Sequence, residues 1–423
     1  MGLSSTLYTG ISGLRSNAEA MSVTGNNISN SNTVGFKSSS TVFSDLLSAS
    51  VASSSGSSQV GRGSQISTIK TNFTQGSFQD TINSTDLAVD GDGFFMVSAA
   101  TSDEINYTRN GSFGFDKNGY LINAEGYRVQ GRGFDPYGQL IGDDPTDIRI
   151  DVNSQIPARQ TSTLTLTTNL DEGSSIVGPF DIDDPSTTSN YSTSTQLYDS
   201  LGNIHVATTY FTKTSSQQWE WHMTVNSSEL DSSVAGSGAL TEVGSGSLTF
   251  DSVGNLLTGG SSSTTASALV WNNGSSVVPQ IDMTFDTTQF NKKSSIISQD
   301  QDGYPPGEFV KVSITDNGTV TTSYSNGEDI DVAMLTLATF ANSAGLNKEG
   351  GSIYSSTARS GEPSIGIAGD SQGYIYTNRL ELSNVDLAQE FVNLITIQNG
   401  YSASSKVITT TDEMLQELIN LVR

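Results

Sequence analysis

Residues 7–28 read LYTGISGLRSNAEAMSVTGNNI, and this stretch decides how the first part of the chain folds. An apolar or small residue recurs there at alternating steps of four and three: Leu7, Ile11, Leu14, Ala18, Met21, Gly25 and Ile28. These steps place all the side chains on one stripe of an α-helix, which is the heptad pattern of a coiled coil. The stretch therefore predicts a helix that buries one face against another helix.

The C-terminal end repeats this spacing. Its stripe positions are Leu387, Phe391, Leu394, Gln398, Tyr401, Ser405, Ile408, Asp412, Leu415, Ile419 and Val422. Ser383 followed by Asp386 predicts a capping box at the helix start, where the acid suits the positive helix end. The polar residues on this stripe weaken an apolar contact between two helices, but they can specify the register in which the helices pair. A helix at each end of the chain implies that the two ends meet.

The two stripes have two interpretations. Most apolar helical stripes are the core face of a globular domain. Ordering one residue costs about 1–2 kcal/mol of backbone entropy, whereas burying a Leu or Ile stabilises by about 1.5–3 kcal/mol. Because each turn carries so few such residues, an isolated helix pair would be only marginally stable. Packing between copies of the chain would bury more apolar surface and stabilise it. We therefore favour the second interpretation, in which the two helices pack against helices of other copies of the chain.

The middle of the chain predicts β structure, because apolar residues alternate at Trp219, Trp221 and Met223. One turn cassette (aromatic, Asp, two free residues, Gly, one free residue, then an aliphatic) recurs at residues 115–121, 134–140, 198–204 and 250–256. The carboxylate can accept turn amides and the glycine can adopt the left-handed conformation of a hairpin bulge. The cassettes predict a multi-hairpin β protein.

Composition limits the partners and the covalent chemistry. Lys+Arg is 19 against 44 for Asp+Glu, a net charge of -25, so nucleic acid and anionic membrane surfaces are poor partners. The sequence has no cysteine, which excludes disulfides and thiolate metal sites. The N-terminus lacks the pattern of a Sec signal peptide, and no run is long enough to span a bilayer. Ser/Gly-rich residues 48–64 predict a linker or an adaptable extended segment.

Three short motifs resemble reactive or metal sites. Residues 369–373 fit G-x-S-x-G around Ser371, but a strand-like run follows where a helix is needed, and both histidines lie upstream. Residues 90–93 and 300–303 resemble calcium loops, but neither continues with the glycine and glutamate of an EF-hand. We therefore predict turns at all three, and no catalytic residue, cofactor or metal.

Four further motifs resemble those of the axial rod and hook proteins of the bacterial flagellum. The N-terminal pair is residues 12–14 (SGL) and 23–37 (VTGNNISNSNTVGFK). The next two are residues 87–97 (LAVDGDGFFMV) and 107–113 (YTRNGSF). The C-terminal motif combines 380–387 (LELSNVDL), 400–401 (GY), 406–410 (KVITT) and 412–415 (DEML). Positions matching the family motif are Asn26, Asn27, Asn32, Gly35, Phe36, Asn384 and Asp386. Asn399, Ser29 and Ser31 depart from its usual residues.

The resemblance implies a mainly β chain with terminal helices in a nested, multidomain arrangement. It implies an inner coiled-coil domain at 1–30 plus 385–423 and a flexible connecting segment at 31–70 plus 371–384. A middle β domain would occupy 71–150 plus 298–370. An outer β domain would occupy 151–297, and this insert distinguishes hook members from the shorter rod members.

The implied function is that of a structural hook subunit, which self-assembles into a flexible hollow tube and acts as a universal joint. The implied partners are further copies of the chain, a hook cap scaffold, the distal rod protein, the hook–filament junction protein and the flagellar type III export apparatus. The implied location is the extracellular hook, reached without a cleaved signal peptide. The implied polymerisation residues are Leu7, Ile11, Leu14, Ala18, Met21, Ile28, Leu387, Phe391, Leu394, Tyr401, Ile408, Leu415, Ile419 and Val422.

Two alternatives stay open. A distal rod protein is a rigid relative within the same family, although a chain without the insert would fit it better. A secreted β-rich adhesin would explain the acidity and the hairpins, but it would not explain helical stripes at both ends.

Overall fold

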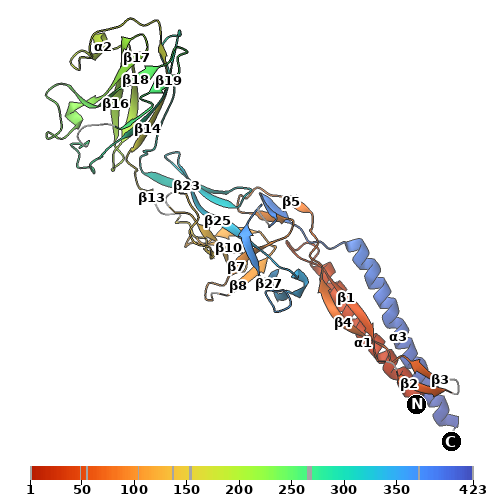
Figure 1. Ribbon diagram of the computed structural model, residues 1–423. Coiled ribbons are helices and arrows are strands. Elements are labelled where there is room, and N and C mark those ends of the chain that lie inside the picture. Colours follow the sequence, from red (N-terminus) through yellow and green to blue (C-terminus); the bar gives the residue numbers. More distant parts are fainter. Residues whose placement is uncertain are drawn as a thin grey trace. The chain divides into compact units, whose positions relative to one another are not determined.

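The structure is a computed structural model that describes residues 2–421, apart from 48, 54–55, 103, 136–137, 152–154, 264–268 and 370–371 (Figure 1). Val422 of the predicted stripe and Ser371 lie outside the described residues. The chain forms two compact units. The first comprises Met1–Val152, Val312–Thr322 and Ile330–Arg423, and the second comprises Asn153–Lys311 and Ser323–Asp329. The finer division of the first unit into inner, connecting and middle parts stays a prediction.

The predicted fold class is confirmed, since the chain is mainly β with a long helix at each end. In the first unit, helices α1 (Gly2–Ser29) and α3 (Leu387–Leu421) lie side by side (Figure 1). Strand β1 (Ser39–Asp45) pairs antiparallel with β4 (Ser64–Thr71), and both contact α1. Between them, β2 (Ala49–Ser53) pairs with β3 (Gly56–Val60). The Ser/Gly-rich segment, predicted as a linker or an adaptable extended segment, is thus extended and largely paired strand where it is described.

The β part of the first unit is built on a stretch of a 13-stranded sheet, in which β24 (Thr319–Tyr324) is followed by β25-β11-β7-β8-β27-β26. The other strands of this stretch are β7 (Phe94–Ser98), β8 (Ile105–Thr108), β11 (Arg128–Gly133), β25 (Asp329–Thr339), β26 (Asn347–Gly350) and β27 (Ile353–Ser355). Shorter elements around it are β5 (Phe78–Asp80), β6 (Leu87–Asp90), β9 (Phe113–Phe115), β10 (Leu121–Asn123), β12 (Thr146–Asp147), η2 (Ser343–Gly345), β28 (Ser364–Ile367), β29 (Tyr374–Thr377) and β30 (Arg379–Glu381). Because β29 pairs with β6 and β30 with β5, the segment leading into α3 is joined to strands from the first quarter of the chain.

The second unit contains two sheets around one core. One sheet has the order β15-β16-β17-β18-β19 and the other β20-β21-β14-β22, in which β14 and β21 are parallel. The strands are β14 (Thr163–Asp171), β15 (Tyr191–Tyr198), β16 (Ile204–Ser215), β17 (Gln218–Asn226), β18 (Leu240–Phe250), β19 (Leu256–Thr258), β20 (Ser261–Ser263), β21 (Asp282–Phe290) and β22 (Ser295–Gln301). The remaining elements of this unit are β13 (Gln155–Ile156), α2 (Pro185–Thr188) and η1 (Ser227–Glu229), while the residues of β23 (Gly307–Ile314) and β24 (Thr319–Tyr324) are divided between the two units. Both sheets contribute apolar side chains to the core, with Trp219 and Trp221 fully buried between them.

The four turn cassettes have the geometry that the sequence predicts. Each aspartate carboxylate accepts the backbone amide four residues later: Asp116 from Tyr120, Asp135 from Gln139, Asp199 from Asn203 and Asp251 from Asn255. The cassette glycines Gly119, Gly138, Gly202 and Gly254 have φ angles of 82, 76, 85 and 93°, a region that favours glycine. The cassette is thus confirmed as a turn, and it appears in both units.

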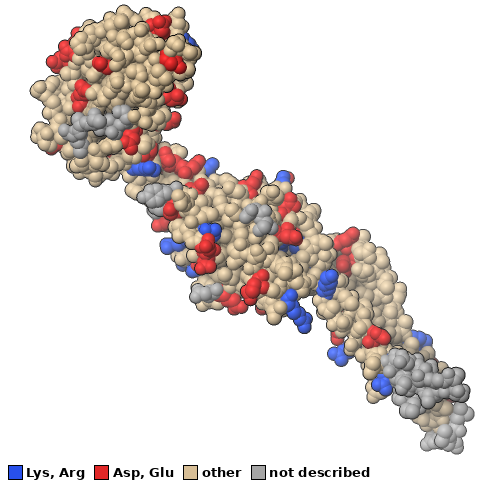
Figure 2. All heavy atoms as spheres, in the orientation of Figure 1, with Lys and Arg blue, Asp and Glu red and all other residues tan. Residues whose placement is uncertain are grey.

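Charged side chains are spread over the surface. Figure 2 shows Asp and Glu over the described surface with fewer Lys and Arg between them, as the net charge of -25 requires. Among the described residues, no helix is long and apolar enough to cross a bilayer.

Candidate functional site

Helices α1 and α3 approach each other closely through small residues. A Cβ atom added to Gly10 would lie 2.9 Å from Ile408 Cγ1, and one added to Gly13 would lie 2.8 Å from Ser404 Oγ. On α3, a Cβ at Gly400 would lie 2.9 Å from the Oδ1 atom of Asn17. Real Cβ atoms essentially never lie this close to another atom, so a larger side chain here would have to displace the facing side chain of the other helix.

The buried face of α1 differs from the predicted stripe. Its members are Gly10, Ser16, Ala20, Thr24 and Asn27. Together with Gly13 and Asn17, most of these positions are spaced by three and four, which is also heptad spacing. The predicted stripe does not include this face because large apolar residues dominate the stripe, whereas close helix packing uses small ones. The sequence signal for this face is Gly, Ala, Ser, Thr and Asn at the same period.

The predicted stripe residues divide into two groups in the single chain. Half-buried members are Leu7, Leu14, Met21, Ile28, Leu394, Ile408 and Leu415. Exposed members are Ile11, Ala18, Leu387, Phe391, Tyr401 and Ile419, with exposed fractions of 52% for Phe391 and 65% for Ile419. Further large apolar residues are exposed on α3: Val392, Ile395, Val407, Met414 and Leu418. The helix pair therefore presents much more apolar surface than a helix buried in a finished core.

Helix α3 begins with a cap at Asp386. Its Oδ1 atom accepts the backbone amides of Ala388 at 2.9 Å and Gln389 at 3.2 Å. Asp386 is therefore the N-cap, and the predicted capping box with Ser383 at that position is wrong. The Ser383 hydroxyl instead accepts the amide of Val385 at 3.3 Å. A carboxylate at the N-cap also interacts favourably with the positive end of the helix.

Asparagines of the family motif join the helices to the β part of the first unit. Asn27 is buried, donates to Ser39 O at 2.7 Å and accepts the Ser39 amide at 2.9 Å. Asn384 accepts the Ser38 amide at 2.8 Å and donates to Thr74 O at 3.0 Å. These amides bond to backbone groups of adjacent residues, so they fix the path of the chain at the one end of the helix pair where α1 finishes and α3 begins.

The other motif positions have more varied environments. Gly35 has a φ of 67°, and its amide donates to Glu381 O at 2.8 Å. A Cβ there would lie 2.6 Å from the backbone nitrogen of Asn110, so only glycine fits. Asn26 is exposed at the end of α1, and Asn32 is exposed in the turn that follows.

A buried ionic cluster lies beneath these contacts. Lys37 and Glu381, 344 residues apart in the chain, pair at 2.5 Å with both side chains fully buried. Arg109, whose side chain is 3% exposed, lies 3.5 Å from the other oxygen of Glu381. Lys37 also donates to Thr74 O at 2.9 Å, and Arg109 donates to Gly91 O at 2.7 Å.

The cluster joins the N-terminal, second, third and C-terminal motifs in one place. Burial lowers the pKa of Lys37, and the nearby Glu381 carboxylate acts in the opposite direction. The pKa of Arg109 is also lowered by burial, again against Glu381. Buried ion pairs contribute little net stability, but removing one partner leaves an uncompensated charge and is strongly destabilising. The cluster therefore ties the two chain ends to one specific position.

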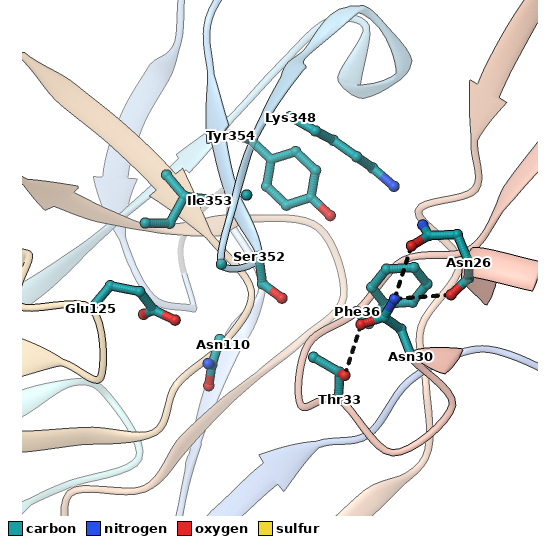
Figure 3. A pocket seen from close by; sticks show the side chains of 12 residues that line it. Asn26, Asn30, Thr33, Phe36, Asn110, Glu125, Lys348, Ser352, Ile353 and Tyr354 are labelled. Atoms are coloured by element: carbon teal, nitrogen blue, oxygen red, sulfur yellow. Dashed lines mark hydrogen bonds between the residues drawn. The ribbon is translucent and has the colours of Figure 1, made fainter. Parts of the chain in front are cut away.

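We call the contact region around the Lys37, Arg109 and Glu381 cluster the junction. A pocket of about 330 Å³ opens beside it (Figure 3). Asn26, Asn30 and Phe36 line it from the end of α1 and the following turn, and Lys348 and Tyr354 line it from β26 and β27. In Figure 3 the Asn30 side chain donates to Asn26 O at 2.9 Å, and Thr33 donates to Asn30.

The Lys348 side chain also forms hydrogen bonds at the junction. It donates to Lys37 O and to Ser39 Oγ, each at 3.0 Å, and burial lowers its pKa. The pocket brings motif residues together, and its lining includes amides, hydroxyls, one cation and one carboxylate, Glu125.

The motifs that resembled reactive or metal sites are structural where they are described. Gly373 donates its amide to Asp92 O at 2.7 Å, and strand β29 follows it rather than a helix. In the second of the calcium-like motifs, residues 300 and 301 end β22 rather than forming a turn, and Asp302 in the bend that follows accepts the amides of Ser162 and Thr163. Among the described residues no group of His, Asp and Glu has the arrangement of a metal site.

Four family models match successive parts of the chain. The flagella basal body rod protein model matches residues 7–37, and the flagellar hook protein FlgE/F/G D1 domain matches 88–169. The flagellar basal body protein FlaE D2 domain matches 169–304, and the flagellar basal body rod FlgEFG protein C-terminal model matches 376–421. These matches fall on both chain ends, on the β part of the first unit and on the second unit.

Three relatives that match almost the whole chain are all described as flagellar hook protein FlgE. The flagellar hook protein FlgE of Escherichia coli (strain K12) is 33% identical over 97% of this chain and 98% of its own length. The flagellar hook protein FlgE of Borreliella burgdorferi is 33% identical over 98% and 99%. The flagellar hook protein FlgE of Brucella suis biovar 1 is 31% identical over the whole of both chains.

A solved structure shares the fold. The crystal structure of the Helicobacter pylori flagellar hook protein FlgE2 is 15% identical, with a TM-score of 0.51 over 71% of this chain and all of that one. Several relatives match the whole chain at above 30% identity, and the family models match its parts in order. Both findings agree with a chain whose two terminal helices pair and whose second unit is inserted in the sequence of the first. The chain belongs to the flagellar hook protein FlgE family.

Proposed function

We propose that this chain is the structural subunit of a flagellar hook, which polymerises through its terminal helices into a flexible hollow tube. Family membership implies polymerisation into the hook of the flagellum. The observation that supports the helical route is the row of exposed apolar side chains on α3, which runs from Leu387 to Ile419. Soluble chains rarely leave such rows open unless another surface covers them.

The net charge makes specific contacts necessary. At -25, two copies repel each other at long range, and only short-range apolar or hydrogen-bonded contacts can hold a polymer together. The helix pair provides apolar side chains, whereas the buried junction at Lys37, Arg109 and Glu381 fixes where that pair sits on the first unit. Helices would thus provide cohesion along the tube.

The β units would provide the compliance of a universal joint. Their own cores are closed, so contacts between neighbouring β units can change without exposing a core. Such a tube bends easily but transmits torque from rod to filament. We also propose the distal rod protein, the hook–filament junction protein, a cap scaffold and the type III export apparatus as partners.

A distal rod protein is the remaining alternative within the family. The full-length relatives are hook proteins whose own length is matched at 98–100%, which favours the hook.

The test is electron microscopy of the concentrated protein under salting-out conditions, with the full chain compared with a fragment of residues 31–384. The proposal expects curved tubes with an axial channel from the full chain and none from the fragment. Tubes from both would show that the terminal helices are not required. Dispersed particles from both, also in the presence of a cap protein, would count against self-assembly.

A further inference from the structure

Oxidisable sulfur in this chain is confined to methionine, because the sequence contains no cysteine. The sequence has seven methionines, and the structure describes all of them except Met1. Three of the described methionines are buried in the β cores: Met96, Met223 and Met283. Met21 and Met334 are half-buried, whereas Met414 on α3 is 59% exposed. Among the described methionines, Met414 is therefore the one that an oxidant in solution reaches most easily.

Met414 belongs to the row of apolar side chains that α3 leaves exposed. Leu418 lies one turn after it and is 46% exposed, and Val407 lies two turns before it and is 39% exposed. Residues at these spacings lie on the same side of a helix. Thr411, which is buried, and Leu415, which is half-buried, lie further round the helix. An apolar strip thus continues outward from the buried face of α3, and Met414 is on its exposed side.

Oxidation reverses the character of this side chain. Hydrogen peroxide transfers one oxygen atom to the thioether, so that a new sulfur–oxygen bond forms, the oxygen–oxygen bond breaks and water leaves. The sulfur is oxidised to a sulfoxide by two electrons, and the peroxide is reduced by the same two. A flexible apolar side chain becomes a polar one, and burying a polar group in an apolar contact without a hydrogen bond is unfavourable.

We propose that Met414 is an oxidation-sensitive site that decides whether a dispersed copy of the chain can enter the polymer. The inference rests on the proposed assembly through the terminal helices and adds a chemical control to it. In the dispersed chain the Met414 thioether is exposed and reacts with peroxide. In the polymer, helices of neighbouring copies cover the exposed strip of α3 and protect it. Peroxide therefore acts on unassembled copies and spares finished tubes.

The chemistry of methionine makes this control reversible. Its unbranched, polarisable thioether fills irregular gaps in a contact between helices, which suits the reduced side chain to assembly. The sulfoxide is returned to the thioether by methionine sulfoxide reductases, one for each epimer at sulfur. A copy that has been oxidised can therefore regain the ability to assemble.

The reactivity of Met414 is tested on dispersed wild-type protein treated with hydrogen peroxide. Peptide mass spectrometry over time should show sulfoxide at Met414 at least about tenfold faster than at the buried methionines, because a buried side chain reacts only after local opening of the fold. Urea-unfolded protein is the control, in which all methionines should react at similar rates. Equal rates at Met414 and at Met96, Met223 and Met283 in the folded protein would overturn the site, whether or not tubes form.

The effect on assembly is measured as the protein concentration needed for tube formation, compared between treated and untreated samples of each variant. Peroxide should raise this concentration about tenfold or more in the wild type. In Met414→Leu the ratio should stay near one, because leucine has a similar volume and cannot be oxidised. Met21→Leu, which removes a half-buried methionine from α1, should be as sensitive as the wild type. Treatment of the oxidised wild type with both sulfoxide reductases should restore tube formation.

Tubes assembled before the peroxide is added provide the last measurement. Their Met414 should be oxidised much more slowly than Met414 of the dispersed protein. The control of assembly would be overturned if Met414→Leu were as sensitive to peroxide as the wild type, if Met21→Leu were the resistant variant, or if Met414 reacted equally fast in tubes. Absence of tubes from the untreated wild type would instead contradict the proposed assembly, while the mass spectra of the dispersed protein would still decide the reactivity of Met414.

Discussion

The paired chain ends and the second unit bury apolar surface in opposite ways. In the second unit Trp219, Trp221 and Phe211 are fully buried between two sheets, so its core is complete within one chain. On α3, by contrast, Phe391, Val392 and Ile395 are each more than half exposed. One region is finished by its own fold, and the other leaves apolar surface open in the single chain. Under the proposed assembly, the two regions would divide between them the work of stabilising the fold and of joining copies.

The largest expected effect comes from a charged residue on the helix stripe. Leu394→Asp should abolish tube formation, because a carboxylate cannot be buried in an apolar contact between helices. The second unit should keep its fold, since it shares no core with α3. Sedimentation and electron microscopy measure the tubes. All three tryptophans lie in the second unit, so their fluorescence reports its folding separately. Normal tubes from this variant would contradict the helical route, and Leu14→Asp is the matched test on α1.

A second test acts on the closed core. Trp221→Ala should lower the free energy of unfolding of the second unit by about 3–5 kcal/mol, because it leaves a cavity at a fully buried site. Urea unfolding followed by the fluorescence of the two remaining tryptophans measures it. Tyr374→Ala, at a site 60% exposed in the first unit, is the control and should leave that transition unchanged.

The third test addresses the junction. Glu381→Gln should destabilise the first unit by about 3–5 kcal/mol, since Lys37 and Arg109 stay buried without their counter-charge. Circular dichroism should show the loss while the tryptophan transition stays in place. Glu19→Gln, which removes the exposed pair with Arg15, should change stability by less than about 1 kcal/mol. Equal effects of the two substitutions would show that the cluster does not hold the ends.

These expectations show what could be predicted from the sequence. The terminal helices, the hairpin cassettes and the mainly β middle follow from local periodicity and turn chemistry, which short segments carry by themselves. The small-residue face with Gly10 and Gly13 was missed because it depends on how closely a second helix approaches. The Lys37–Glu381 pair was also beyond reach, because no local pattern joins residues 344 positions apart. The composition of segment 48–64 indicates a linker or an adaptable extended segment, but it does not reveal that the segment pairs with itself as strands.

Acid should affect the second unit through Asp199. Burial opposes its ionisation, but hydrogen bonds from Asn203, Asn273 and the turn amides outweigh burial and lower its pKa to about 2. A group with a lowered folded-state pKa stabilises the fold above its unfolded pKa and loses that contribution as the pH falls through the folded value. The second unit should therefore lose about 2 kcal/mol between pH 4 and pH 2, measured by tryptophan fluorescence in urea. In Asp199→Asn that part of the pH dependence should disappear, and an unchanged profile would contradict it.

The smallest expected effect is at the start of α3. Asp386→Ala should cost about 1 kcal/mol of helix stability, because the amides of Ala388 and Gln389 lose their acceptor. Asp386→Ser should restore most of it. Tubes should still form but melt at a lower temperature, which light scattering during heating measures. Ser383→Ala should have a smaller effect, because Ser383 is not the cap.

The most direct test of the division between a finished core and an unfinished helix pair is thiol labelling in the dispersed protein and in the tube. Phe391→Cys and Ile297→Cys place single thiols at sites exposed by 52 and 66% in the isolated chain, on α3 and on the second unit. Both should react quickly with a maleimide in the dispersed protein. In tubes, Phe391→Cys should become strongly protected while Ile297→Cys stays reactive. Equal reactivity of Phe391→Cys in tubes and in dispersed protein would contradict the account, because the apolar face of α3 would then remain uncovered in the polymer.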